Sequence, residues 1–287
     1  LMQLSDFPVD GSVTIVEFVE LYCFIRARHL RSSYAVSCSL HRMARRLPVQ
    51  RLCDLRRSDV SQYIASRLAL GRTVRTVNVE LLIFSAALNY ARNHWGWQID
   101  NPISGQFLRE PPGRVRFLYR HEFSRLVDAC SRLPGVHGDT LPDFARLAVN
   151  TGMRKTELLM LRWDQINGDR LTLEPEHTKN CRRRIVPLNE SARAVLARRR
   201  GRSSFVLGPI KGLYPPWHQA CKMADIEDFR IHDLRHTFAS WLVLAGVPLL
   251  QVRDLLGHSS IKMTERYSHL TQEALFKAVA VLDQELV

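Results

Sequence analysis

The chain has no long apolar run and little lysine for a basic protein. Its longest apolar stretch, residues 241–250, is interrupted by Gly246 and Pro248 and is shorter than the about 18 residues that a membrane span needs. No charged-then-apolar leader opens the sequence, so no secretory signal is expected. These absences favour a soluble, globular protein without membrane contact, and the expected location is the cytoplasm.

Recognisable metal-binding spacing is also missing. The 6 cysteines contain no C-x-x-C pair, which is typical of reduced thiols in a cytosolic protein. Among the 11 histidines, His232 and His236 are four apart. The zinc-protease helix pattern is absent because Arg125 stands where the second histidine after His121 would be. We therefore predict no metal and no other cofactor.

Positive charge is what the chain has in excess. The net charge is +13, and 35 of the 41 basic residues are arginine. Before Gly113 there are 14 basic against 9 acidic residues, and from Gly113 onward 27 against 19, so the two parts carry +5 and +8. Two basic parts are expected if both contact a polyanion such as nucleic acid. Codon bias in a GC-rich genome is the alternative source of the arginines.

Hydrophobic periodicity predicts two domains separated by a linker. Residues 12–110 read as helical, which places a helical domain at 1–108, and residues 109–116 combine two prolines, a glycine and three arginines. Residues 117–287 mix helical and strand patterns. The expected fold is therefore mainly α with a small β-sheet in the C-terminal domain, preceded by an all-helical N-terminal domain.

The expected elements follow from apolar spacing and capping residues. In the first domain the helices are one capped by Ser12 or Thr14, one capped by Ser58, and one over 76–93. In the second domain the helices are 120–131, 140–151, 189–199, 215–224, 233–245, 248–256 and 271–284, with strands over 171–174 and 184–188.

Two helix starts combine an arginine with a second functional side chain. In "TGMRKTELLMLRWDQI", Arg154 and Glu157 share a face near backbone N–H groups that favour anions. Taken alone, this pair is more often a surface ion pair than a phosphate site. In "IHDLRHTFASWL", His232 and Arg235 share a face, which suits a buried anion site. A capping His-Asp pair with an exposed arginine is the alternative.

Three further positions are ambiguous when taken singly. Lys179 lies in the loop between the two expected strands, followed by arginines at 182–184. A hairpin lysine is often only solvated, and an arginine run is often a basic surface. His258 follows a glycine at a helix end, like an ordinary cap, and Tyr267 lies at the edge of a polar stretch.

The order of these residues along the chain is more informative. Arg, Lys, His-x-x-Arg, Gly-His and Tyr at these separations resemble the tyrosine recombinase family, the phage-integrase type of site-specific DNA recombinase. The matching stretches are "TGMRKTEL", "TKNCRRRIVPL", "HDLRHTFAS", "LLGHSS" and "ERYSHL", and more loosely "TVRTVNVELLIFSAALNYA". One departure is Cys181, where family members commonly have glycine in the lysine hairpin.

The resemblance implies a covalent mechanism at Tyr267. Its phenol would attack the scissile DNA phosphate, form a 3′-phosphotyrosyl bond and free a 5′-hydroxyl. A phenol of pKa ~10 is ionised only about one part in a thousand at pH 7, so it needs a base and a positive field. In the family, His232 would be the base, and Lys179 would protonate the leaving 5′-oxygen.

The remaining implied roles concern phosphate charge. Arg154 and Arg235 would bind the non-bridging oxygens, and His258 would add a hydrogen bond to them. Glu157 would orient the site. Fixed side-chain cations would supply what metal ions supply in many phosphoryl-transfer enzymes, so no metal or nucleotide is required.

DNA contacts and assembly are also implied. Expected partners are double-stranded DNA with specific core sites and further copies of the chain, as a monomer in solution and a homo-tetramer on DNA. The two domains would form a clamp around the duplex. An ordinary solvated surface is the alternative for each candidate DNA contact. The candidate contacts are Arg72, Arg75, Asn78, Arg114, Arg116, Arg182 and Arg183.

The last segment has an apolar face that includes Phe276 and Leu282. It could pack on its own domain, or dock on a neighbouring protomer as such tails do in the family. Replacing both residues with aspartate is expected to abolish tetramers on DNA and to spare the folding of the monomer.

The expected function is site-specific recombination that integrates or excises a mobile element. The first alternative is a type IB topoisomerase-like enzyme that nicks and reseals one duplex. The second is a catalytically silent DNA-binding protein, which would form no covalent adduct with DNA.

Overall fold

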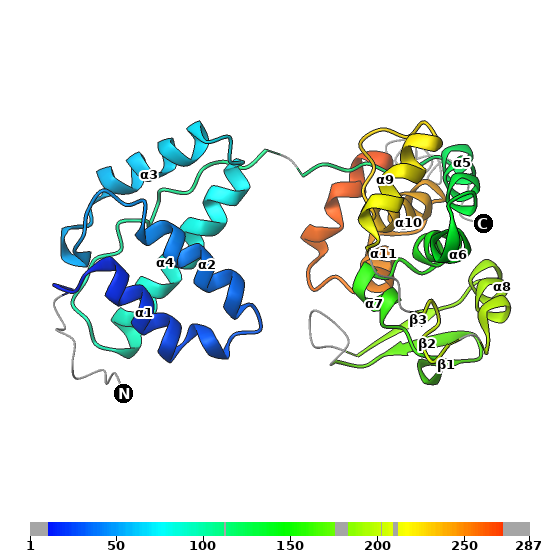
Figure 1. Ribbon diagram of the computed structural model, residues 1–287, viewed down its shortest axis with the longest axis horizontal. Coiled ribbons are helices and arrows are strands. Elements are labelled where there is room, and N and C mark those ends of the chain that lie inside the picture. Colours follow the sequence, from blue (N-terminus) through cyan, green and yellow to red (C-terminus); the bar gives the residue numbers. More distant parts are fainter. Residues whose placement is uncertain (1–10, 112, 176–182, 202, 209–211, 272–287) are drawn as a thin grey trace, which may run out of the picture. The chain divides into compact units, whose positions relative to one another are not determined.

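The computed structural model describes residues 11–111, 113–175, 183–201, 203–208 and 212–271. The chain divides into two compact units, residues 1–112 and 113–287, called here the N-terminal and C-terminal units. The described elements are mainly helices, and the strands form one small sheet in the C-terminal unit (Figure 1). The predicted fold class is confirmed.

The N-terminal unit is built from helices. They are α1 (Ile15–Ile25), α2 (Ser33–Ala44), α3 (Arg57–Ala69) and α4 (Val74–His94), with short 3-10 turns at Ala27–His29 and Leu52–Asp54. Thr14 caps α1, because its hydroxyl accepts the Glu17 N–H at 3.1 Å and the Glu17 carboxylate accepts the Thr14 N–H at 2.9 Å. The predicted Ser58 cap is wrong. Helix α3 begins at Arg57, and the Asp59 carboxylate accepts the Arg56 N–H at 2.7 Å.

A buried carboxylate ties three of these helices together. Glu80 of α4 is 2% exposed and accepts two hydrogen bonds from Arg67 of α3, at 2.7 and 2.9 Å. It also accepts one from Arg42 of α2 at 3.0 Å and one from the Tyr63 hydroxyl at 2.8 Å. Every lone pair of this carboxylate has a donor, which is the condition under which a charge is tolerated in a core.

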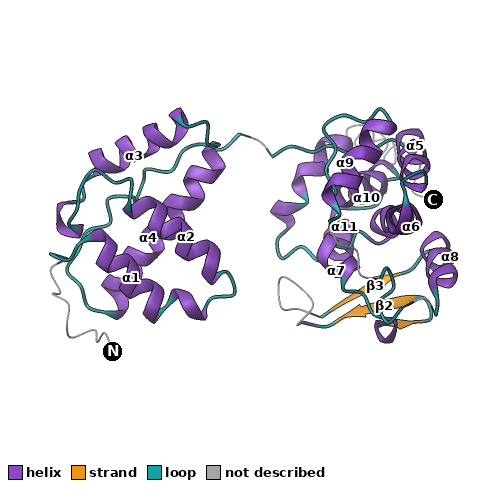
Figure 2. Ribbon diagram, in the orientation of Figure 1, coloured by secondary structure: helices purple, strands orange, loops and turns teal. Residues whose placement is uncertain are grey.

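The C-terminal unit packs helices around one main core and a three-stranded sheet. Its helices are α5 (Arg120–Ser131), α6 (Gly135–Thr151), α7 (Lys155–Leu159), α8 (Glu190–Arg199), α9 (Tyr214–Met223), α10 (Asp233–Leu244) and α11 (Leu249–Leu256). The sheet has the antiparallel order β1 (Ile166–Asn167), β2 (Arg170–Leu173) and β3 (Arg184–Pro187) (Figure 2). Leu171 and Val186 pair across β2 and β3, and both are buried.

Helix α10 is central to the functional part of this unit. It packs against α6, α11 and the 3-10 turn Glu265–Thr271 that carries Tyr267. A second apolar cluster fills this contact, with Phe238, Val252, Leu256 and Tyr267 among its buried members. The segment 113–118, at the start of the unit, also contacts α10. The helix predicted at 271–284 lies outside the described residues, except for Thr271.

None of the described helices combines the length and the apolar character that crossing a membrane would require.

Candidate active site

Arg235 is a buried cation on the first turn of α10. It is 4% exposed, and its guanidinium donates to the Gly152 carbonyl at 2.6 Å and to the Leu256 carbonyl at 2.5 Å. These carbonyls lie at the C-terminal ends of α6 and α11, where helices carry partial negative charge. Burial, followed by the nearby charges of Arg154 and Arg184, lowers the pKa of Arg235 to about 9. The guanidinium therefore remains positively charged at neutral pH.

Glycine is required at the ends of both helices. Gly152 and Gly257 have φ values of +62° and +63°, which side chains with a Cβ rarely adopt. An added Cβ would lie 2.4 Å from the Phe238 ring at the first position and 2.6 Å from Arg184 Cδ at the second. The two turns lead the chain directly toward Arg154 and His258, so they place two of the predicted site residues.

Glu157 links two further arginines. Its buried carboxylate accepts the Arg154 N–H at 2.9 Å, the Arg154 guanidinium at 2.7 Å and the Arg184 guanidinium at 2.8 Å. Although burial opposes ionisation, the charge of Arg184 and the hydrogen bonds from Arg154 lower the pKa of Glu157. Arg184 also donates to the Leu255 and Leu256 carbonyls. Arg184 and Arg235 therefore share the Leu256 carbonyl, which connects the cations into one network.

His258 is held as a neutral ring beside these cations. Its Nδ1 lies 2.9 Å from the hydroxyl of the fully buried Thr264. Burial, followed by the charges of Arg235 and Arg154, lowers the pKa of His258 to about 3. When Nδ1 accepts the Thr264 hydroxyl, the ring proton is on Nε2. This tautomer gives the pocket an N–H donor without adding charge.

The Tyr267 hydroxyl is paired with a histidine that the sequence analysis did not assign to it. Tyr267 is 1% exposed, and its hydroxyl lies 2.6 Å from Nδ1 of His236. Burial raises the pKa of Tyr267 to about 12, against the opposing charges of Arg235 and Arg266. Burial and the neighbouring His232 lower the pKa of His236 to about 4. At neutral pH the phenol is therefore protonated and donates to a neutral imidazole.

His232, the predicted base, lies one turn before His236. The two rings are perpendicular, with centroids 5.3 Å apart. His232 is exposed, at the N-cap of α10. Neighbouring protein atoms still remove part of the water around the ring. This desolvation, followed by the charge of Arg235, lowers the pKa of His232, so the ring is neutral at physiological pH. Within the described residues, no group of three or more His, Cys, Asp or Glu side chains is arranged to hold a metal ion.

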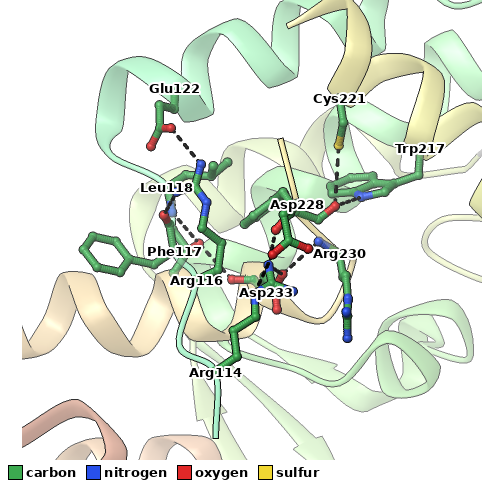
Figure 3. Close-up of polar contacts among 12 residues, drawn as sticks. Arg114, Arg116, Phe117, Leu118, Glu122, Trp217, Cys221, Asp228, Arg230 and Asp233 are labelled. Carbon is green, nitrogen blue, oxygen red and sulfur yellow. Dashed lines mark hydrogen bonds and ion pairs between the residues drawn. The ribbon is translucent and has the colours of Figure 1, made fainter. Parts of the chain in front are cut away.

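The segment 113–118 is fixed to α10 by several contacts (Figure 3). Arg114 bridges Asp233, at 3.0 Å, and Asp228, at 3.1 Å. The Leu118 N–H donates to Thr237 at 3.1 Å, and the Leu118 carbonyl accepts from Trp241 at 2.8 Å. The acid that Arg114 contacts is therefore the residue next to His232.

The other predicted DNA contacts differ in how free their side chains are. Arg72 is exposed, while Arg75 and Arg183 are exposed and pair with Glu110 and Glu174. Arg116 pairs with Glu122 at 2.9 Å.

Asn78 is buried, and its side chain is already used by the protein. Its amide nitrogen donates to the Leu108 carbonyl and the Glu110 carboxylate, and its amide oxygen accepts the Leu108 N–H. The amide of Asn78 therefore fixes residues 108–110 against α4. Lys179 and Arg182 lie outside the described residues.

Two residues of this site were missed by the sequence analysis, although each has a signal in the sequence. His236 stands one helical turn after His232, so both lie on the same side of α10. Arg184 and Val186 stand two apart in a strand, and such residues face the same way. The burial of Val186 therefore implies that Arg184 also points inward, unlike Ile185, which is 51% exposed.

The fold and the site together define a protein that gathers three arginines, three histidines and a buried tyrosine in one unit. Two family models match the chain: the Phage integrase family over residues 116–274, and the Phage integrase, N-terminal domain, over residues 12–106. The chain belongs to the phage integrase family, and the resemblance to tyrosine recombinases predicted from the motifs is confirmed.

Individual relatives agree with this membership. The Integrase of Salmonella phage P22 is 32% identical over 232 residues, which cover 73% of this chain and 58% of that protein. The Shufflon-specific DNA recombinase of Escherichia coli is 31% identical over 234 residues, covering 74% and 57%. The chain thus spans a little over half the length of these relatives.

A solved structure shares the fold. The lambda integrase dimer bound to a COC′ core site has a TM-score of 0.74 at 20% identity, over 89% of this chain and 95% of that chain.

Proposed function

We propose that the protein is a site-specific DNA recombinase that cuts and rejoins DNA strands through a covalent bond to Tyr267. The observation that carries the proposal is the buried network in which Arg154, Glu157, Arg184 and Arg235 are connected within the same unit as Tyr267. Three guanidiniums and one carboxylate in this network leave an excess of positive charge. A phosphate group is the ligand that balances this excess and also receives fork-shaped hydrogen bonds.

The reaction begins with attack of the Tyr267 oxygen on the scissile phosphorus. The P–O bond to the 5′-oxygen breaks, the 3′-phosphate becomes linked to the tyrosine, and the departing 5′-oxygen takes up a proton. Arg154 and Arg235 bind the non-bridging oxygens, where negative charge increases in the transition state. His258 donates from Nε2 to the same oxygens. Lys179 is the proposed donor of the proton to the 5′-oxygen.

Activation of Tyr267 needs a base. With a pKa of about 12, its phenol is roughly 7 kcal/mol from being ionised at pH 7. His236 already accepts the phenolic hydrogen bond, and His232 lies next to it. We assign proton acceptance to this histidine pair, with His236 as the direct contact of the phenol and His232 as the exposed member. The DNA phosphate brings negative charge that raises the pKa of both rings, which strengthens them as bases.

Because the phosphotyrosine keeps the energy of the phosphodiester, a 5′-hydroxyl from another strand can reverse the attack. Strand exchange then needs no nucleotide. We propose that the substrates are core sites in double-stranded DNA, that integration or excision of a mobile element is the outcome, and that a homo-tetramer acts on DNA while the free protein is a monomer. The expected setting is the cytoplasm of a bacterium, in association with its DNA.

These assembly proposals have partial support from solved structures. Lambda integrase is described as a dimer on a core site and as a tetramer on a Holliday junction. The segment that contains Phe276 and Leu282 lies outside the described residues. Its docking on a neighbouring copy therefore remains a prediction from the sequence.

The test uses a nicked suicide duplex. After cleavage, the short fragment that carries the freed 5′-hydroxyl diffuses away, so the strand cannot be rejoined. The wild-type protein is expected to form a protein–DNA adduct that resists denaturant, and Tyr267→Phe is expected to form none. Tyr119→Phe, which alters a tyrosine that is 58% exposed, is the matched control and should retain the adduct. Absence of any adduct from the wild-type protein would support the silent DNA-binding alternative. Two-site substrates separate recombination from the topoisomerase-like alternative, which yields relaxation without recombinant product.

A further inference from the structure

A second cationic pocket opens beside the proposed active site. It has a volume of about 400 Å³, within the range of about 300–1,000 Å³ that is usual for ligand sites. Its lining residues come from α7, α9 and the residues before α10: Lys155, Tyr214, Trp217, His218, Arg230, Ile231 and His232. His232 is thus part of this pocket and of the proposed active site.

The lining is basic, and no carboxylate is among its described residues. Lys155 donates to the Tyr214 hydroxyl at 2.9 Å and lies 4.6 Å from the centre of that ring. The Arg230 guanidinium has no ion pair within the described part of the chain, and only its backbone N–H bonds to Asp233. In Figure 3 the Arg230 side chain extends away from the carboxylates of Asp228 and Asp233.

The lack of an ion pair at Arg230 contrasts with the state of other arginines in this unit. Arg114, Arg116 and Arg154 are all neutralised by carboxylates at 2.7–3.1 Å. Among the residues that the structure describes, Lys155 and Arg230 have no such partner, so their charge is available to an anion from outside. Unpaired cations grouped at one cavity repel one another, and binding of an anion relieves that repulsion.

The pocket also has an apolar part. Trp217 and Ile231 are buried, and Tyr214 is 55% exposed. A cationic rim over an apolar floor suits a group that is charged at one end and weakly polar at the other. A deoxyribose with its phosphate has this character, because the sugar can lie on the floor and the phosphate against Lys155 and Arg230.

We propose that this pocket binds the sugar–phosphate unit adjacent to the scissile phosphate, on the strand that is cut. The inference rests on the proposed function. Two connections to the active site favour an adjacent phosphate: His232 lines both sites, and Lys155 directly follows Arg154. Binding there would hold the strand on both sides of the bond that breaks, which reduces the freedom of the reacting phosphate.

The test replaces single phosphates of the core-site duplex with uncharged methylphosphonates, one linkage at a time on both sides of the cleavage point. Equilibrium binding is measured with Tyr267→Phe protein, so that the result does not depend on cleavage. Neutralising the phosphate in the pocket is expected to weaken binding about tenfold, the usual effect of one charge-assisted hydrogen bond. Lys155→Met and Arg230→Gln should each weaken binding of the unmodified duplex by a similar factor.

The decisive comparison combines neutralisation of the phosphate in the DNA with substitution of Lys155 or Arg230 in the protein. If Lys155 and Arg230 contact that phosphate, each variant should show a smaller additional loss than the unaltered protein when it is neutralised, because one of the two contacts is already missing. Lys222→Met removes an exposed charge from α9 outside the pocket and should behave like the unaltered protein. Arg230 is exposed, so Arg230→Gln should fold normally even if Lys155→Met does not.

The outcomes separate the two proposals. Variants that remain as sensitive as the unaltered protein to every methylphosphonate would overturn the pocket assignment. An adduct assay in which the wild-type protein does not react would instead overturn the proposed function, while the binding scan would still report on the pocket.

Discussion

At the scale of single residues, the state of the Tyr267 hydroxyl determines what the site must do before it reacts. The phenol is buried, protonated and bonded to His236 at 2.6 Å. Its partner is a neutral ring whose pKa, about 4, is too low to take the proton without help. The free protein is therefore in a resting arrangement, and the negative charge of a bound phosphate is needed to make the histidine a better base.

The hydrogen bond between His236 and Tyr267 can be measured as a coupling between two substitutions. His236→Ala leaves the buried phenol without an acceptor and is expected to lower the free energy of unfolding by about 1–3 kcal/mol through that loss, in addition to the packing that is removed. In a Tyr267→Phe background the same change should be less costly, because no hydroxyl remains to be satisfied. Urea unfolding of the four proteins gives the difference. Equal costs in the two backgrounds would show that the bond contributes nothing.

Much of this site could be predicted from residue order. Arg154, Glu157, Arg235, His258 and Tyr267 lie in one unit as the motifs predicted. The partner of the phenol could not be predicted, because it depends on how the turn Glu265–Thr271 lies against α10. That position is set by apolar packing between segments about thirty residues apart, which spacing within one helix does not encode.

At the scale of elements, the helices with clear amphipathic spacing were predicted and α2 was missed. Its sequence, "SYAVSCSLHRMA", contains three serines, and only Leu40 and Met43 are its fully buried apolar side chains. Its position is fixed partly by tertiary contacts, such as Arg42 on Glu80. Local propensity is weak for such a segment, and packing determines its structure.

Glu80 should therefore be critical for the arrangement of α2, α3 and α4. Glu80→Gln removes the charge that Arg67, itself 3% exposed, requires as a partner. Breaking a buried ion pair at one side typically costs about 3–5 kcal/mol. Thermal unfolding should show a large loss of stability in the N-terminal unit.

The matched control is Glu20→Gln, at a carboxylate that is half exposed and pairs with His41. Exposed pairs contribute about 0–1 kcal/mol, so this variant should be close to wild type. Similar effects of the two substitutions would mean that burial does not give Glu80 its importance.

The contact of segment 113–118 with α10 leads to a prediction on pH dependence. The charge of Asp233 raises the pKa of His232, and Arg114 neutralises that charge at 3.0 Å. In Arg114→Gln the unpaired Asp233 should raise the pKa of His232. A base acts only when neutral, so the pH below which adduct formation declines should move upward. Single-turnover rates across pH test this.

Arg116→Gln is the control for this pH profile. It removes an equal charge from the same segment but leaves Asp233 paired, because Arg116 contacts Glu122. The midpoint of the pH profile of adduct formation in Arg116→Gln should match that of the wild-type protein. A profile that is unchanged in Arg114→Gln would exclude the effect of Asp233 on the base.

At the scale of the whole molecule, the two units have separate cores and opposite responses to acid. In the N-terminal unit, burial lowers the pKa of His41, but hydrogen bonds to Glu20 and to the Ser37 carbonyl outweigh it and raise the pKa overall. A raised histidine pKa gives stability that is present below pH 6.5 and is lost as pH rises through the folded value. The N-terminal unit should thus gain slightly from mild acid.

The C-terminal unit should lose stability in the same range. His236 and His258 have pKa values of about 4 and about 3 in the folded protein, against about 6.5 when unfolded. The unfolded chain binds protons first, so stability is complete above pH 6.5 and falls as pH decreases, by roughly 2 kcal/mol per ring at pH 5. The ionised carboxylates Glu80 and Glu157, with lowered pKa values, begin to matter only below about pH 4.5.

Peptide-resolved hydrogen exchange separates the two units in one experiment, when the rates are corrected for the pH dependence of intrinsic amide exchange. Between pH 7 and pH 5, peptides from α6, α10 and α11 should lose protection, and peptides from α1 and α4 should not. His258→Asn should reduce the slope for the C-terminal unit by about half, because one of the two rings no longer titrates. If both units lost protection in parallel and this variant left the slope unchanged, the acid sensitivity would come from overall charge repulsion at +13 rather than from His236 and His258.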